Sequence, residues 1–77
     1  MKNTTLDQLK PGDEGKVKAL NAQGQLRTRL MDMGMITGTT VTMVRKAPLG
    51  DPLEVEIRGY SLSLRKEEAK LVDLEIA

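Results

Sequence analysis

The chain has 77 residues, with 12 basic and 11 acidic side chains and a formal net charge of +1 at pH 7. It contains no cysteine and no histidine, which excludes disulfides, thiol nucleophiles and imidazole bases or ligands. Basic and acidic residues are interspersed and Tyr60 is the only aromatic residue, a composition that disfavours nucleic acid as the main partner. The apolar fraction of 39% must build an aliphatic core.

The N-terminus lacks the pattern of a secretory signal, because Met1 to Lys10 include no apolar h-region. No stretch approaches the roughly 18 apolar residues that are needed to cross a bilayer. We therefore expect one domain, residues 1–77, that is cytoplasmic and does not insert into a membrane.

The first predicted elements are a turn and a strand. Thr5 precedes the sequence Leu-Asp-Gln-Leu at 6–9, which predicts a short capped turn that ends at residues 11–13. Gly15 then opens a strand at 16–20, in which apolar residues alternate with lysines.

A helix is predicted from about Gln25. Leu26, Leu30 and Met33 stand at i, i+4 and i+7 and form one apolar stripe. Gly34 is well placed as the left-handed residue that follows the last turn.

Asp32 is unusual in this helix, because a carboxylate in the last turn opposes the helix dipole. Local pairing with Arg29 would explain it. Alternatively, Arg29 and Asp32 belong to a functional or loop-fixing cluster.

The methionines at 31, 33 and 35 could indicate soft Cu(I) binding through thioethers. In a helix, however, Met31 and Met33 would point about 200° apart. The pattern favours core or contact roles for these residues, and we predict no metal site and no cofactor.

After Gly38, the β-branched run 39–44 predicts a second strand. The segment 47–53 follows, Ala-Pro-Leu-Gly-Asp-Pro-Leu, in which Pro48 and Pro52 exclude a helix or the interior of a sheet. Leu49 lies at its centre, where a surface turn normally carries a polar residue. This leucine is either a contact point for a partner or packs back on the protein.

Residues 53–58 strictly alternate apolar and charged side chains, which predicts a strand with one solvent-exposed face. Gly59 and Tyr60 are predicted to form a two-residue type II′ turn. The resulting hairpin would pair Ile57 with Leu62, Val55 with Leu64 and Glu54 with Arg65.

The last elements are a short helical turn at 66–69 and a strand at 72–76. Five short strands in so small a chain would form a mainly β, partly open barrel with one inserted α-helix, because closure protects strand edges. The edges that remain open would permit weak self-association.

Side chains for catalysis are missing, and we expect that the protein is not an enzyme. The adjacent acids Asp13-Glu14 and Glu67-Glu68 are interpreted as solvated charge, because neighbouring residues do not face each other. Four arginines could supply an arginine finger to a partner, but the pattern favours ordinary solvent-exposed positions on the sheet or helix: Arg29, Arg45, Arg58 and Arg65.

Three segments together resemble the FeoA family of bacterial ferrous-iron uptake: residues 29–34 with Gly38 and Val41, residues 47–52, and residues 59–65 with Glu68-Ala69. The resemblance implies an SH3-like barrel with an inserted helix. It also implies a partner, the membrane ferrous-iron permease FeoB, whose cytosolic part includes a GTP-binding domain. It supplies no catalytic or iron-binding residue.

We therefore expect an accessory protein that docks on the permease and supports or regulates Fe²⁺ transport. The predicted contact residues are Leu49, Gly50 and Asp51 with Met31 and Arg29, and the predicted turn and cap residues are Gly34, Gly38, Pro48, Pro52 and Gly59. Two alternatives remain: regulation of the permease's GTP hydrolysis, and peptide binding by a module like the C-terminal domain of iron-dependent repressors.

Overall fold

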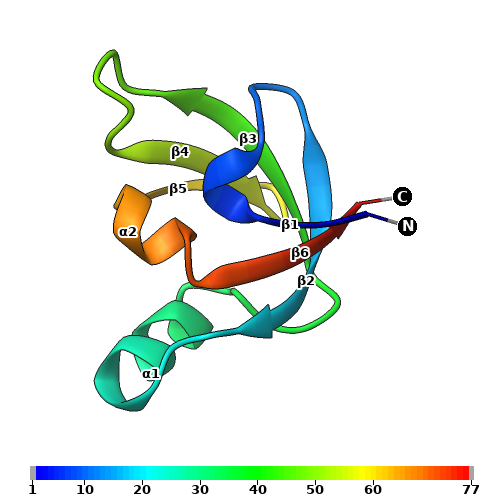
Figure 1. The fold of residues 1–77 in the computed structure, drawn as a ribbon, viewed down its shortest axis with the longest axis vertical. Helices are drawn as coiled ribbons and strands as arrows, with labels where there is room; N and C mark the ends of the chain where they lie inside the picture. The colour runs from blue at the N-terminus through cyan, green and yellow to red at the C-terminus, as the bar shows by residue number, and fades with distance from the viewer. Residues whose placement is uncertain (1, 77) are drawn as a thin grey trace.

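Antiparallel strands form one curved sheet in the order β1-β6-β2-β3-β4-β5 in the computed structural model, which describes residues 2–76 (Figure 1). The strands are β1 (Lys2–Thr5), β2 (Glu14–Leu20), β3 (Thr40–Lys46), β4 (Leu53–Ile57), β5 (Tyr60–Leu64) and β6 (Val72–Ile76). The 3-10 turn η1 (Leu6–Gln8) and the helices α1 (Gly24–Asp32) and α2 (Lys66–Ala69) lie between them. Because β1 and β5 end the sheet without pairing to each other, the barrel is partly open.

The sheet has six strands within residues 2–76, one more than the sequence predicted. The additional strand is β1, which pairs with β6 from Lys2 opposite Ile76 to Thr5 opposite Asp73. Its sequence, Lys-Asn-Thr-Thr, has no apolar alternation, and an edge strand on a ladder of backbone hydrogen bonds does not require one. The predicted turn at 6–9 is present as η1. The predicted cap is not, because the Thr5 hydroxyl donates a hydrogen bond to the Asp7 carboxylate and makes no capping bond to the backbone of η1.

The predicted helix is confirmed as α1, with Leu30 on its buried side. Gly34 follows the last turn at φ +106°, in the left-handed region. The backbone there passes close to β5, since the Tyr60 hydroxyl donates a hydrogen bond of 2.8 Å to the Met33 carbonyl. A Cβ atom on Gly34 would lie 2.7 Å from that hydroxyl oxygen, so the position accepts only glycine without rearrangement.

The predicted hairpin is present between β4 and β5, but its predicted register is wrong. Arg58 and Gly59 form the turn with φ +50° and +85°, the two positive values of a type I′ turn. Ile57 therefore lies opposite Tyr60, and Val55 lies opposite Leu62. The register differs from the predicted one by two residues, and this shift preserves which side chains share a face.

The core is aliphatic, as the composition required. Residues with at most 2% of their surface exposed come from η1, α1, α2 and every strand except β1, and from the segments that join them. The largest of them are Leu6, Leu9, Leu30, Met35, Met43, Leu53, Ile57, Leu64, Leu74, Val17, Val41 and Val55. Met35 and Met43 thus serve as core residues.

The remaining elements agree with the sequence, since α2 and β6 lie at the predicted residues. α2 has a defined start, because the Glu68 carboxylate accepts a 2.8 Å hydrogen bond from the Arg65 amide. Among residues 2–76, neither helix has the length and apolar character of a membrane span.

Candidate functional site

The loop between β3 and β4, residues 47–52, carries the most exposed large apolar side chain among residues 2–76. Two backbone hydrogen bonds close the loop: Ala47 donates to the Pro52 carbonyl at 3.0 Å, and Gly50 donates to the Ala47 carbonyl at 2.7 Å. Leu49 lies within this closed segment and is 96% exposed. The alternative in which Leu49 packs back on the barrel is therefore wrong.

Asp51 attaches the loop to α2. Its Oδ1 accepts a 3.0 Å hydrogen bond from the Lys66 amide, at the first residue of the helix. Its Oδ2 lies 4.0 Å from Nη1 of Arg65. These contacts hold the base of the loop against α2 while Leu49 stays free, so Asp51 has an internal role, and its role in docking stays a prediction.

Arg29 approaches α2 from the other side. Its Nη1 lies 3.2 Å from Oε2 of Glu68, so the predicted local pairing with Asp32 is wrong. Glu68 itself is only 6% exposed, and its interpretation as solvated charge is also wrong. The sequence did contain a signal for the structural role of Glu68. Glu68 lies three residues after Arg65, the residue that precedes α2, and this is the spacing of a capping box.

Met31 is 42% exposed on α1 and borders a hollow of about 230 Å³. The hollow is lined by Lys18, Ala19, Leu20, Arg27, Met31, Met35, Ile36 and Thr37. In Figure 1, α1 and the β3–β4 loop lie at opposite ends of the molecule's longest axis, which extends 30 Å. The structure therefore separates Met31 from Leu49, and the predicted contact residues form two surfaces.

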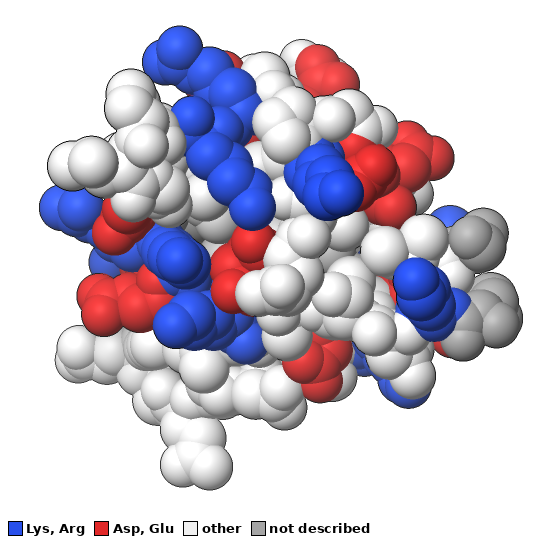
Figure 2. All heavy atoms as spheres, turned by 45° about the horizontal axis from the view of Figure 1, so that its top comes forward, with Lys and Arg blue, Asp and Glu red and all other residues white. Residues whose placement is uncertain are grey.

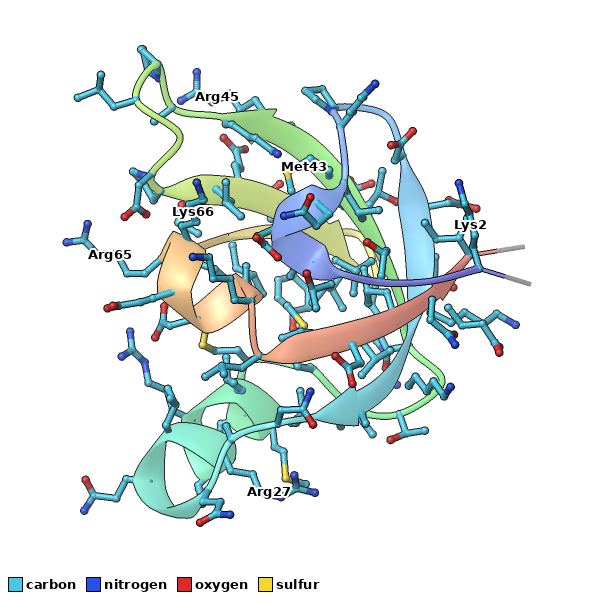
Figure 3. The ribbon with its side chains drawn as sticks, viewed as in Figure 1. Lys2, Arg27, Met43, Arg45, Arg65 and Lys66 are labelled. Carbon is cyan, nitrogen blue, oxygen red and sulfur yellow. The ribbon has the colours of Figure 1, made fainter. Side chains whose placement is uncertain are left out.

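Basic side chains surround the base of the β3–β4 loop. Figure 3 shows Arg45 beside the loop and Arg65 and Lys66 at the start of α2. Figure 2 shows basic and acidic side chains alternating across one face of the molecule. Three of the four arginines that were considered as arginine fingers are paired within the chain: Arg45 with Glu54 at 3.0 Å, Arg65 with Asp51, and Arg29 with Glu68.

The Arg45–Glu54 pair replaces the predicted pairing of Glu54 with Arg65, because Ser63 lies opposite Glu54 in the observed register. As for metal sites, residues 2–76 contain no cluster of three acidic side chains able to hold an ion. The feature of the described residues that suggests contact with a partner is the β3–β4 loop with its exposed Leu49.

Comparison with known proteins shows the family. The FeoA domain matches residues 4–76. An Fe²⁺ transport protein A/Fe²⁺ transporter FeoB fusion protein of Porphyromonas gingivalis is 37% identical over 71 residues, which are 92% of this chain. The chain spans only 8% of the length of that fusion protein.

Solved structures of the family have the same fold. The FeoA-like protein of Clostridium acetobutylicum matches with a TM-score of 0.89 and 39% identity, covering 99% of this chain and 88% of that one. FeoA of Stenotrophomonas maltophilia, a procaryotic SH3 domain protein solved in complex with zinc, matches with a TM-score of 0.81 and 32% identity. That match covers 94% of this chain and 89% of the other, and it confirms the SH3-like fold.

A manganese-dependent transcriptional repressor shares the fold alone, at 16% identity and a TM-score of 0.89. This match covers 100% of this chain and 38% of the repressor. The same barrel therefore occurs as one part of a longer chain.

Proposed function

The chain belongs to the FeoA family, and on that basis we propose that it is an accessory protein of ferrous-iron uptake that docks on the cytosolic region of a FeoB-type permease. The observation that supports this most strongly is the Porphyromonas gingivalis protein, in which a relative of this chain is fused to the transporter. Fusion raises the effective concentration of one module near the other, which benefits modules that act together.

Leu49 is the side chain that we propose as the centre of the docking surface. Burying an exposed leucine contributes about 1.5–3 kcal/mol. The loop that carries it is closed by the two backbone hydrogen bonds at its base and tied to α2 through Asp51, so docking orders little additional chain. Arg45 and Arg65 beside the loop are already paired with Glu54 and Asp51. The exposed Lys66, for which the described residues show no ion pair, favours an acidic group on the permease.

Leu49→Asp tests this surface. We expect the variant to bind the cytosolic region of the permease about 10- to 100-fold more weakly, because a carboxylate replaces the apolar contact. Binding is measured by titration of the purified permease region, and Leu49→Ile, which keeps an apolar side chain, is the matched control. Since Leu49 is 96% exposed, both variants should have the thermal unfolding midpoint of the wild type. Wild-type affinity of a folded Leu49→Asp variant would contradict the assignment.

The Met31 hollow is a second surface at which the same permease could be contacted, and it is separate from the loop. Met31→Asp in the same titration distinguishes the two. If the β3–β4 loop is the docking surface, Met31→Asp should bind with the affinity of the wild type.

A further inference from the structure

The outer edge of β5 is open. β5 pairs only with β4 within residues 2–76 and forms one end of the sheet. Because the two-residue turn makes Ile57 and Tyr60 a hydrogen-bonded pair, Tyr60, Leu62 and Leu64 direct their backbone groups toward β4. The amides and carbonyls of Ser61 and Ser63 therefore point away from the sheet, and both serines are exposed.

This edge lacks the usual protection against further pairing. Natural edge strands carry charges, proline or a bulge, or are very short. β5 has the sequence Tyr-Ser-Leu-Ser-Leu, with no charge and no proline, and its pairing with β4 has no register shift. The opposite edge, β1, is one residue shorter and includes Lys2. β5 is thus a regular template on which another extended segment can pair.

We propose that the edge of β5 receives an extended, acidic segment of the partner protein as an added strand. This inference rests on the proposed docking function, since the segment would belong to the same permease. Its backbone would bond to Ser61 and Ser63, and its alternate apolar side chains would cover the half-buried Leu62 and the 46% exposed Tyr60.

The cations at the two ends of β5 favour an acidic segment. Arg58 precedes the strand, Lys66 follows it, and both are exposed with no ion pair among the described residues, whereas Arg65 already lies 4.0 Å from Asp51. Carboxylates at the two ends of the added strand would lie near these cations.

The same charges disfavour a second copy of this chain as the occupant. Antiparallel pairing of two β5 strands with full overlap centres on Leu62. Arg58 of each copy would then approach Lys66 of the other, and like charges opposite each other destabilise a strand pair.

Ser63→Pro tests the added strand. Proline removes the amide of residue 63, which points away from β4, so the β4–β5 ladder keeps all its hydrogen bonds. We expect the variant to bind the cytosolic region of the permease at least about tenfold more weakly, since a hydrogen bond to the added strand is lost and the ring blocks its approach. Ser63→Thr, which keeps the amide and suits a strand, should bind like the wild type.

Amide hydrogen exchange of the unaltered protein provides a second measurement, independent of how well the proline variant folds. The amides of Ser61 and Ser63 should exchange at least about tenfold more slowly when the permease region is bound. Unchanged exchange at both serines in the complex would overturn the added strand. Protection that instead rises with the concentration of this protein alone would assign the edge to a second copy.

The two proposals fail differently. If Leu49→Asp weakens binding while Ser63→Pro and the serine amides show no effect, docking stands and the added strand is wrong. If the wild-type protein does not bind the permease region at all, both proposals are wrong.

Discussion

Gly34 shows how a single position fixes the attachment of the inserted helix to the barrel. It combines φ +106° with a close approach in which a Cβ atom would lie 2.7 Å from the Tyr60 hydroxyl oxygen. Gly38 also has a positive φ, +92°, but no atom lies within 4 Å of the position of its Cβ atom. A substitution at Gly38 would thus introduce backbone strain alone, whereas a substitution at Gly34 would introduce backbone strain and a steric clash.

We expect Gly34→Ala to lower the free energy of unfolding by about 2–4 kcal/mol, and Gly38→Ala by about 1–2 kcal/mol. Urea unfolding followed by circular dichroism measures both. In a Tyr60→Phe background the hydroxyl is absent, so the cost of Gly34→Ala should fall toward that of Gly38→Ala. An equal cost in the two backgrounds would contradict the steric explanation.

Glu68 is a buried acid with two structural contacts, the Arg65 amide and the Arg29 guanidinium. Asp51 makes a corresponding contact with the Lys66 amide from the β3–β4 loop. Through these contacts α2 connects α1 with the β3–β4 loop. Two acidic residues thereby hold in place a short helix that would not be stable alone.

At the scale of elements, the β4–β5 hairpin depends on the identity of its turn residues. Arg58 adopts φ +50°, a conformation that is costly for a residue other than glycine, asparagine or aspartate. Gly59 occupies the second left-handed position at no such cost. One of the two turn residues therefore suits its backbone conformation, and a substitution at position 58 can raise the stability of the protein.

Arg58→Asn should raise the free energy of unfolding by about 0.5–1 kcal/mol, because Asn-Gly is the preferred type I′ pair. Arg58→Lys, which keeps the charge and the backbone cost, should leave stability unchanged. Urea titrations of the three proteins measure the difference. If the turn lay at Gly59-Tyr60 instead, residue 58 would be in the strand and asparagine would destabilise it, so the sign of the change distinguishes the two registers.

At the scale of the whole molecule, one aliphatic core holds the sheet, η1 and both helices together. The chain has no cysteine for a disulfide, so packing carries the stability. A domain of this length has a free energy of unfolding of about 4–12 kcal/mol, so one large cavity removes a substantial part of it. Leu6 in η1 is fully buried and far along the chain from Tyr60 in β5.

Leu6→Ala should lower the free energy of unfolding by about 2–5 kcal/mol through the lost contacts and the cavity. Leu49→Ala, at an exposed position, should change it by less than about 0.5 kcal/mol. Circular dichroism and the fluorescence of Tyr60 should report one coincident urea transition in each variant, because the core is single. Separate transitions would show that η1 unfolds independently of β5.

Features that depend on local pattern could be predicted from the amino-acid sequence. Alternation or β-branched composition predicted five of the six strands, the stripe of Leu26, Leu30 and Met33 predicted the helix, and Pro48 and Pro52 predicted a stiff turn. The resemblance to the FeoA family identified the SH3-like fold, which the solved structures confirm.

Contacts between distant elements became visible in the folded protein alone. A two-residue shift leaves alternation unchanged, so pattern could not distinguish Leu62 from Leu64 as the neighbour of Val55. β1 is held by backbone bonds to β6, which polar side chains do not reveal. The partners of Arg29 and Asp51, and the separation of Met31 from Leu49, depend on contacts between distant segments, for which a local sequence pattern contains no information.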